Sequence, residues 1–322
     1  MKHAFCQALA PLVLLALACL PLAGAAQLAG GTVRLVVPLA PAGPSDQAAR
    51  LIANAMSKAL GQEVVVDNKP GALGAIGAQA VAMTPPDGRT LLFAPSGMVG
   101  LPVLMKNPSF ASLSEFTAIG AVGGNQICLF VSSGVPANTV KEFVAHARAN
   151  PDKLSYGSSS PGEYLISSQF LQATGVRMER IPYKGSAQMM PDFLEGRVQV
   201  AFIPAGAGAP HLKTGRAKLL ACSAAQRLPG LPDVPTMAES GVPNVGWHTV
   251  HLILAPARMP AELTARLAAA LREAANDPKV RAEFERMLIP VEALTPAQAF
   301  DNIRAGEVMW AKFVRDVGLT PE

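Results

Sequence analysis

Three loops of this chain combine glycine, small and hydroxyl residues in a pattern that suits the binding of an anion. The first is "PLAPAGPSD" at 38–46, which follows an apolar run and precedes apolar residues at helical spacing. The stretches "YGSSSPG" at 156–162 and "PYKGSAQ" at 182–188 have the same kind of position. Unpaired N–H groups and the positive dipole end at a helix N-terminus favour negative charge. The chemistry to expect is therefore anion binding by main-chain donors.

The first loop contains prolines that restrict its backbone before any ligand arrives. Gly43 allows close backbone approach, and Ser45 or Asp46 can cap the following helix. An aspartate that faced the ligand would repel a carboxylate. We therefore interpret Asp46 as a cap that orders the loop while backbone amides meet the ligand. For this loop alone, helix capping without ligand binding stays an open alternative.

The stretch "NKPGALGAIG" at 68–77 differs from a dinucleotide-binding loop. Its glycines have the spacing GxxGxxG rather than GxGxxG, and no acidic residue ends the next predicted strand. A tight turn and close helix packing are expected here, and no cofactor is predicted.

Catalytic and metal-binding patterns find little support in the sequence. There is no G-x-S-x-G motif, and no paired carboxylates follow a strand in an arrangement for acid–base chemistry. His211, His248 and His251 have no cysteine or carboxylate at ligand spacing. We interpret His248 and His251 as features of a loop or strand. No catalytic residue and no metal site are predicted.

The N-terminus has the pattern of a cleaved export signal at residues 1–25. An apolar stretch ends in Ala23-Gly24-Ala25, which matches a signal-peptidase site, so cleavage is expected near residue 25 or 26. Cys19 suggests a lipid anchor, but the residues before it form a poor lipobox, and the interpretation is disfavoured. The net charge of +4 is mild and evenly spread, so no nucleic-acid partner is expected.

Two cysteines lie beyond the export signal, Cys128 and Cys222. An exported protein meets an oxidising compartment, so they could pair. Both lie in apolar, strand-like runs, "QICLFV" and "KLLACSA". We expect two buried free thiols, and a disulfide stays open.

Short apolar runs alternate with helical patterns along the chain, which predicts parallel α/β sheets. Helices are expected at 47–60 and after 138, and near 75–83, 98–105, 162–174, 186–195 and 207–215. Proline and glycine cluster at 120–125 and 229–246. The chain is expected to form lobe 1 from 26–125 and 247–322, and lobe 2 from 126–246. A ligand would bind in the cleft between them.

Five stretches, in the same order, resemble those of the Bug-type substrate-binding proteins of tripartite tricarboxylate transporters, the TctC family. They are "VVPLAPAGPSD", "VVVDNKPGALGAIGAQAVAMTPPDGRTLLF", "YKGSAQMMPDFLEGRVQVAF", "GRAKLLACSAAQR" and "LPDVPTMAESGVP". The resemblance implies a two-lobed periplasmic binding protein of the Venus-flytrap, type II-like class. Each lobe would be a mostly parallel sheet flanked by helices.

The resemblance also implies a ligand and partners. The chain would be a monomeric periplasmic receptor without cofactor that binds a small organic carboxylate and delivers it to TctA/TctB-like membrane subunits. Backbone groups of the first loop would bind one carboxylate, and residues of two later loops would face it. The residues expected at the ligand are Leu39, Pro41, Ala42, Gly43, Ser45, Asp46, Ser96, Ser158, Ser159, Ser160, Tyr183, Gly185, Ser186 and Ala187.

The sequence departs from the family at Ala42 and Leu73, where glycines are common. Two alternatives also stay open. One is a receptor that reports its ligand to a membrane sensor. The other is an exported hydrolase, for which Ser158, Ser159 and Ser160 are the clustered candidate nucleophiles.

Overall fold

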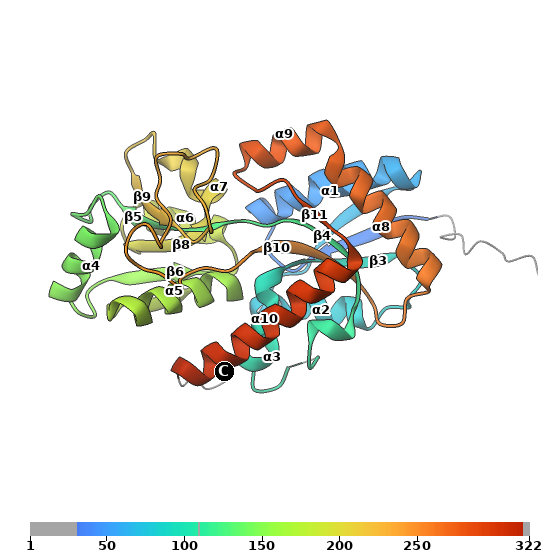
Figure 1. Cartoon of the computed structure of the whole chain (residues 1–322), viewed down its shortest axis with the longest axis horizontal. Helices are drawn as coiled ribbons and strands as arrows, with labels where there is room; N and C mark the ends of the chain where they lie inside the picture. Colours follow the sequence, from blue (N-terminus) through green and yellow to red (C-terminus); the bar gives the residue numbers. More distant parts are fainter. Residues whose placement is uncertain (1–30, 109, 318–322) are drawn as a thin grey trace, which may run out of the picture.

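The structure is a computed structural model that describes residues 31–108 and 110–317. Two lobes lie side by side, and each contains a sheet with helices on both faces (Figure 1). Blue, teal and orange-red segments form lobe 1, and green to yellow segments form lobe 2. The expected two-lobed α/β fold is confirmed. The expected export signal lies outside the described residues.

The sheet of lobe 1 has six strands in the order β11-β4-β10-β3-β1-β2. Strand β1 pairs in parallel with β2 and β3, whereas β10 runs antiparallel to β3 and β4, as does β11 to β4. The strands are β1 (Val33–Val37), β2 (Val64–Asn68), β3 (Thr90–Pro95), β4 (Thr117–Gly123), β10 (Val250–Ala255) and β11 (Ala293–Leu294).

The sheet of lobe 2 has five strands in the order β7-β6-β8-β5-β9. Strand β6 is parallel to β7 and β8, and β5 is antiparallel to β8 and β9. The strands are β5 (Ile127–Ser132), β6 (Ser155–Ser158), β7 (Glu179–Pro182), β8 (Val200–Pro204) and β9 (Ala217–Cys222).

Both sheets are thus mixed rather than mostly parallel. Strands β5 and β10 are the ones that the chain enters directly from the other lobe. They begin beside the cleft, where β1, β3 and β8 end. Strand β10 therefore runs antiparallel to β3, and β5 runs antiparallel to β8.

Helices cover lobe 1 on both faces because its central strands are buried on both sides. The side chains of β1 alternate between two cores: Leu35 and Val37 pack into one, and Val36 packs into the other. The first core contains α1 (Pro44–Leu60), α8 (Ala261–Asn276) and α9 (Pro278–Arg286). The second contains α2 (Ala75–Ala82), the 3₁₀ helix η2 (Ser96–Gly100), α3 (Leu101–Leu104) and α10 (Pro296–Val317).

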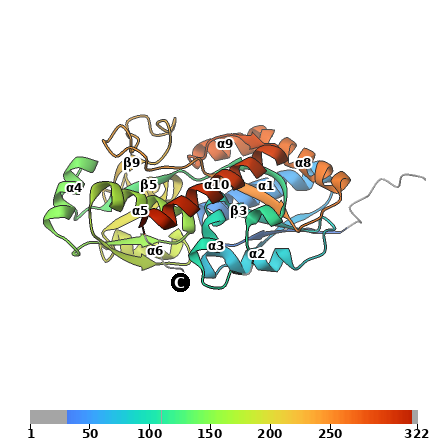
Figure 2. The same cartoon turned by 60° about the horizontal axis from the view of Figure 1, so that its bottom comes forward.

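Lobe 2 repeats this arrangement (Figure 2). Helices α4 (Val140–Ala149) and α5 (Pro161–Thr174) cover one face, and α6 (Ser186–Leu194) and α7 (Ala205–Gly208) cover the other. Two expected helices are broken: 98–105 is η2 followed by α3, and 207–215 is α7 followed by the 3₁₀ turn η4 (Ala209–His211). The long helix α10 is absent from the sequence prediction. No described helix is both long and apolar enough to cross a membrane.

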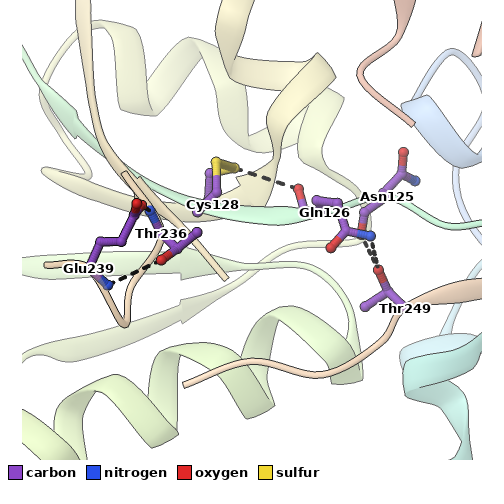
Figure 3. The surroundings of a disulfide bond; sticks show 7 residues. Asn125, Gln126, Cys128, Thr236, Glu239 and Thr249 are labelled. Carbon is purple, nitrogen blue, oxygen red and sulfur yellow. Dashed lines mark hydrogen bonds between the residues drawn. A yellow bond between two sulfur atoms is a disulfide. The ribbon is translucent and has the colours of Figure 1, made fainter. Parts of the chain in front are cut away.

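The two cysteines are bonded to each other. Cys128 on β5 and Cys222 on β9 are direct partners in the antiparallel register, with an S–S distance of 2.00 Å (Figure 3). The expectation of free thiols is therefore wrong. Which residues face each other depends on the strand register, and neither apolar run specifies that register by itself.

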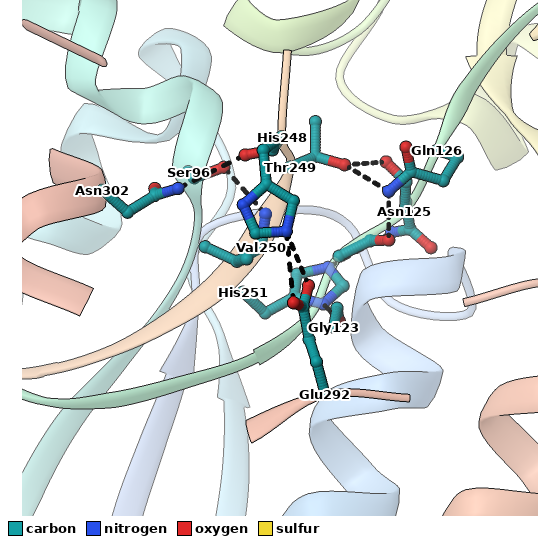
Figure 4. A network of polar contacts seen from close by, with 11 residues as sticks. Ser96, Gly123, Asn125, Gln126, His248, Thr249, Val250, His251, Glu292 and Asn302 are labelled. Atoms are coloured by element: carbon teal, nitrogen blue, oxygen red, sulfur yellow. Dashed lines mark hydrogen bonds and ion pairs between the residues drawn. The ribbon is translucent and has the colours of Figure 1, made fainter. Parts of the chain in front are cut away.

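The two segments that cross between the lobes are tied together. Gln126 Nε2 donates to Thr249 Oγ1 at 2.9 Å, and Thr249 Oγ1 donates to the carbonyl of Asn125 at 2.8 Å (Figure 4). Gln126 and Thr249 are both buried. The crossing segments therefore act as one unit beside the cleft.

Loss of the disulfide should destabilise the protein. It closes a loop of 94 residues, so the double variant Cys128→Ala/Cys222→Ala should lose about 2 to 4 kcal/mol in free energy of unfolding. Urea denaturation of both proteins, with and without reductant, measures the loss. Equal midpoints for the oxidised wild type and the variant would contradict the prediction.

Candidate functional site: the cavity between the lobes

A cavity of about 60 Å³ lies between the lobes and is lined by both. Lobe 1 contributes the loop after β1, the start of η2 and the start of β10. Lobe 2 contributes the starts of α5 and α6. Such a volume accommodates a few water molecules or a small polar group, so the site is narrow.

Several helix N-termini converge on this cavity. Gly43 to Asp46 begin α1, Ser160 to Glu163 begin α5, and Gly185 to Ala187 begin α6. In α1, Gln47 is the first residue whose N–H joins the helical ladder, to the carbonyl of Gly43. Within the described part of the chain, the N–H groups of Gly43, Ser45 and Asp46 have no hydrogen-bond partner. The cavity wall therefore offers unpaired main-chain donors.

The loop after β1 is organised by the carboxylate of Asp46. It accepts from the N–H of Ala42 at 2.9 Å, from Arg50 Nε at 2.9 Å and from Asn68 Nδ2 at 2.8 Å. Asn68 also donates to the carbonyl of Leu39 at 3.1 Å. Burial alone would raise the pKa of Asp46, but the hydrogen bonds from Arg50, Asn68 and Ala42 outweigh it and lower that pKa. The carboxylate is thus ionised and neutralised within its own lobe.

Asp46 orders the loop as expected, but not as an N-cap. The N-cap of α1 is Gly43, which has no side chain to accept a hydrogen bond. Helix α1 begins at Pro44, earlier than predicted, because proline at the first helical position has a suitable φ and lacks an N–H that would be unpaired there. Asp46 reaches back from the first turn and binds the loop instead.

In this loop Ala42, rather than Gly43, has the backbone conformation that favours glycine. Ala42 has φ 66°, in the left-handed region, whereas Gly43 has φ −76°. A Cβ added at Gly43 would meet only the carbonyl oxygen of Ala40, at 3.8 Å. Leu73, the second departure from the family pattern, is also left-handed, with φ 56°. Both replacements therefore keep a backbone conformation that favours glycine.

Ser45 belongs to a buried polar cluster with Asn125 and His251. The Nδ1 atom of His251 lies 2.9 Å from the carbonyl oxygen of Gly123 and donates to it, so Nε2 is an acceptor (Figure 4). Asn125 Nδ2 lies 3.2 Å from that Nε2 and 3.1 Å from Ser45 Oγ, and its two hydrogens serve both. Ser45 Oγ also lies 3.3 Å from that Nε2, so its hydroxyl hydrogen can be donated either to the imidazole or to a ligand.

His251 is neutral at neutral pH. Burial lowers its pKa to about 4, and the hydrogen bond to Gly123, which raises the pKa, only partly opposes this. Its ring stacks on Phe93 with centroids 4.7 Å apart. His251 therefore positions Ser45 and Asn125 without adding charge to the cavity.

Glu163 is a buried carboxyl on the lobe 2 wall. Its Oε2 accepts from the N–H of Ser159 at 2.6 Å and from Ser159 Oγ at 2.7 Å, and its Oε1 accepts from Ser186 Oγ at 3.3 Å. Burial raises the pKa of Glu163 to about 7, although the hydrogen bonds from Ser159 and Ser186 oppose the shift. No cation is among its hydrogen-bond partners within the described chain.

Most of the residues expected at the ligand line the cavity. These are Leu39, Gly43, Ser45, Asp46, Ser96, Ser159, Ser160, Gly185, Ser186 and Ala187.

Four others do not line it. Pro41 is exposed, and Ala42 lines an adjoining cavity of about 480 Å³, which shares Gly43 and Ser186 with the first. Ser158 Oγ accepts from Arg180 Nε at 2.9 Å, and the hydroxyl of Tyr183 donates to Asp192 at 2.7 Å.

Sequence reasoning missed Asn125, Glu163, Thr249 and His251, which all line the cavity. Only Glu163 carries a local signal, since it stands three residues after Ser160 in a capping-box pattern. The others come from the crossing segments, and only the fold brings those to the cleft. Among the described residues, no group of three side chains suited to a metal ion occurs.

Glycines allow the lobes to approach closely. A Cβ added at Gly97 of lobe 1 would lie 2.6 Å from the backbone N of Gly162 in lobe 2. One added at Gly206 of lobe 2 would lie 2.5 Å from the carbonyl oxygen of Met287 in lobe 1. The structure thus has the lobes closed on the cavity.

Comparison with known proteins identifies the family. A family model described as the tripartite tricarboxylate transporter family receptor, TctC, matches residues 48–312. The chain belongs to the TctC family. A UPF0065 protein of Bordetella bronchiseptica is 35% identical over 277 residues, which cover 86% of this chain and 82% of that protein. The expected resemblance is confirmed.

Solved structures agree with this membership. The periplasmic binding protein BugD is 30% identical, with a TM-score of 0.84 over 90% of this chain and 99% of that one. An R. palustris protein with adipate is 30% identical, with a TM-score of 0.86 over 90% and 98%. MatC from Rhodopseudomonas palustris with bound malate is 27% identical, with a TM-score of 0.83 over 88% and 98%. The chain is thus a solute receptor of the kind found in the periplasm, and its relatives are binding proteins rather than enzymes.

The buried carboxyl of Glu163 should make stability depend on pH. Its native pKa of about 7 exceeds the ordinary 4.5, so the folded protein binds more protons between these values and stability falls as pH rises. Between pH 4.5 and pH 7.5, the free energy of unfolding of the wild type should fall by roughly 2 to 3 kcal/mol relative to that of Glu163→Gln. Urea denaturation at each pH measures this.

Glu142→Gln is the matched control. Glu142 accepts from the N–H of Asn138 at 2.7 Å at the start of α4, in the same capping pattern but exposed. If the difference in unfolding free energy between wild type and Glu163→Gln does not change with pH, the prediction that buried Glu163 titrates in this range is wrong.

Proposed function

We propose that this protein binds a small organic carboxylate in the cavity between its lobes and delivers it to the membrane subunits of a tripartite tricarboxylate-type transporter. One observation carries the proposal: within the described chain, the N–H groups of Gly43, Ser45 and Asp46 are unpaired at the wall of the cavity between the lobes. Asp46 is neutralised by Arg50, so it does not repel an anion bound there.

The relatives support a carboxylate as the ligand. Two similar proteins have adipate and malate bound, and both compounds carry carboxylates. In this chain the carboxylate would accept from the loop amides and from the hydroxyl of Ser45. Residues of the α5 and α6 termini, Ser159 to Ser160 and Gly185 to Ala187, would face it from lobe 2.

Closure follows from contacts with both lobes. A ligand that touches α1 on one side and α6 on the other binds the closed form better than the open form, so binding shifts the population toward closure. The loop is ordered by Asp46 beforehand, which limits the entropy lost on binding.

The candidate nucleophiles support binding rather than catalysis. Ser158 accepts from Arg180, Ser159 donates to Glu163, and Ser160 accepts from the N–H of Glu163. Ser45 lies 3.3 Å from His251 Nε2, but a pKa of about 4 makes this imidazole a weak general base at neutral pH.

The remaining features of the proposal concern the chain's processing and partners. Residues 1–25 would be removed on export to the periplasm, and the mature receptor would act as a monomer on TctA/TctB-like subunits. Lobe boundaries near residues 125 and 247 are supported by sheet membership, because β4 ends at Gly123 and β10 begins at Val250.

A panel of small mono-, di- and amino-carboxylates tests the function. At least one should raise the melting temperature of the wild type, and calorimetry should show Ser45→Ala weakening its binding about tenfold, as expected for one hydrogen bond to a charged group. Ser158→Ala is the matched control and should bind within about twofold of wild type. If no carboxylate binds protein shown by mass spectrometry to be ligand-free, the proposal fails.

Closure can be tested at the glycine contact. The methyl group of Gly97→Ala would meet the backbone of Gly162, so full closure should be blocked and affinity should fall about tenfold or more. Gly162→Ala is a matched control, because its methyl would lie 3.7 Å from Gly97 Cα, an ordinary contact. Equal affinities of the two variants would argue against closure on the ligand.

A further inference from the structure

Two buried carboxyl groups line the cavity, and they differ in their hydrogen-bond and charge partners. Asp46 in lobe 1 is paired with Arg50, with Asn68 as a further donor. Glu163 in lobe 2 is met by neutral donors, namely the N–H and hydroxyl of Ser159, the backbone of Ser160 and the hydroxyl of Ser186. Among the described residues that line the cavity, none is a lysine or arginine. One wall therefore has a neutralised acid and the other has an acid without a cation.

No basic side chain of a neighbouring element forms an ion pair with Glu163 in the described chain, and Lys184, in the loop before α6, is exposed. The packed 3₁₀ helix η2 carries no ionisable residue, and on β10 the cavity meets neutral His251. Arg180 on β7 is engaged elsewhere: its Nε donates to Ser158 Oγ, and its guanidinium stacks 4.1 Å over the ring of Tyr164. The remaining charge at the cavity, Asp46, is itself an acid.

Glu163 also changes what the start of α5 offers a ligand. A free helix terminus presents donors to an anion. Here Ser159 already donates to Glu163 through both its N–H and its hydroxyl. A ligand in the cavity therefore meets a carboxyl group on this wall, and its Oε1 accepts from Ser186 at the long distance of 3.3 Å.

We propose that Glu163 makes this receptor select a carboxylate that also carries an ammonium group, that is an amino acid, and discriminate against a second carboxylate at the lobe 2 wall. The inference rests on the proposed function, since the loop amides of lobe 1 bind the ligand's carboxylate. The ammonium group then supplies the cation that Glu163 lacks within the protein. A second carboxylate in that place would face a like charge at close range in a narrow site.

The selectivity should depend on pH through Glu163. Above pH 7 the ionised carboxyl attracts ammonium and repels carboxylate. Below that value the protonated form can donate to a second carboxylate and no longer attracts a cation. Preference for amino acids should therefore weaken as pH falls from about 8.5 to about 5.5.

Matched pairs of ligands test the proposal by calorimetry. The pairs are 3-aminopropanoate with succinate, 4-aminobutanoate with glutarate and 5-aminopentanoate with adipate, and L-alanine and L-leucine are added as α-amino acids. At pH 8.5 the wild type should bind its best amino acid at least about tenfold more tightly than any dicarboxylate. Glu163→Gln should lose this preference, and Glu142→Gln, which changes the same capping position of α4, should keep it.

The outcomes separate the inference from the function on which it rests. Dicarboxylates that bind the wild type at pH 8.5 as tightly as the best amino acid would overturn the inference and leave the carboxylate receptor intact. An unchanged preference in Glu163→Gln would also overturn it, and thermal denaturation would show that this variant is folded. Failure of every acid to bind wild type and variants alike would refute the proposed function itself.

Discussion

The binding of Asp46 to its own lobe is the interaction on which the site depends. Its carboxylate joins the N–H of Ala42, the guanidinium of Arg50 and the amide of Asn68. These bonds fix the loop after β1, keep Ala42 in a left-handed conformation and cancel the negative charge of Asp46. As a result, the first turn of α1 can present unpaired N–H groups to an anion without an opposing charge.

The cavity is organised as two walls with different electrostatic character. On the lobe 1 wall, helix-terminal amides and the hydroxyl of Ser45 are donors, and the neutral His251 keeps Asn125 and Ser45 in place. On the lobe 2 wall, Glu163 takes up donors of its own helix terminus and carries a carboxyl group without a cation. A ligand bound between the closed lobes must suit both walls. The group that it presents to the lobe 1 donors and the group that it presents to Glu163 therefore decide together which solute binds.

Sequence reasoning found the loops but not all of the side chains that complete the site. The lobes, the strand-to-helix loops and the ordering role of Asp46 follow from local patterns, because proline, glycine and capping residues act on near neighbours. Asn125 and His251 meet Ser45 only because two crossing segments lie beside the first loop. The Cys128–Cys222 bond and the antiparallel direction of β5 likewise depend on pairing between distant strands.

The most direct measurement is a crystal structure of the protein with its tightest-binding carboxylate. The account predicts that the carboxylate oxygens lie within about 3.2 Å of the amide nitrogens of Gly43, Ser45 or Asp46, with Asp46 still bound to Ala42 and Arg50. A ligand whose carboxylate lies away from these amides, or a loop in which Asp46 has turned toward the ligand, would contradict it.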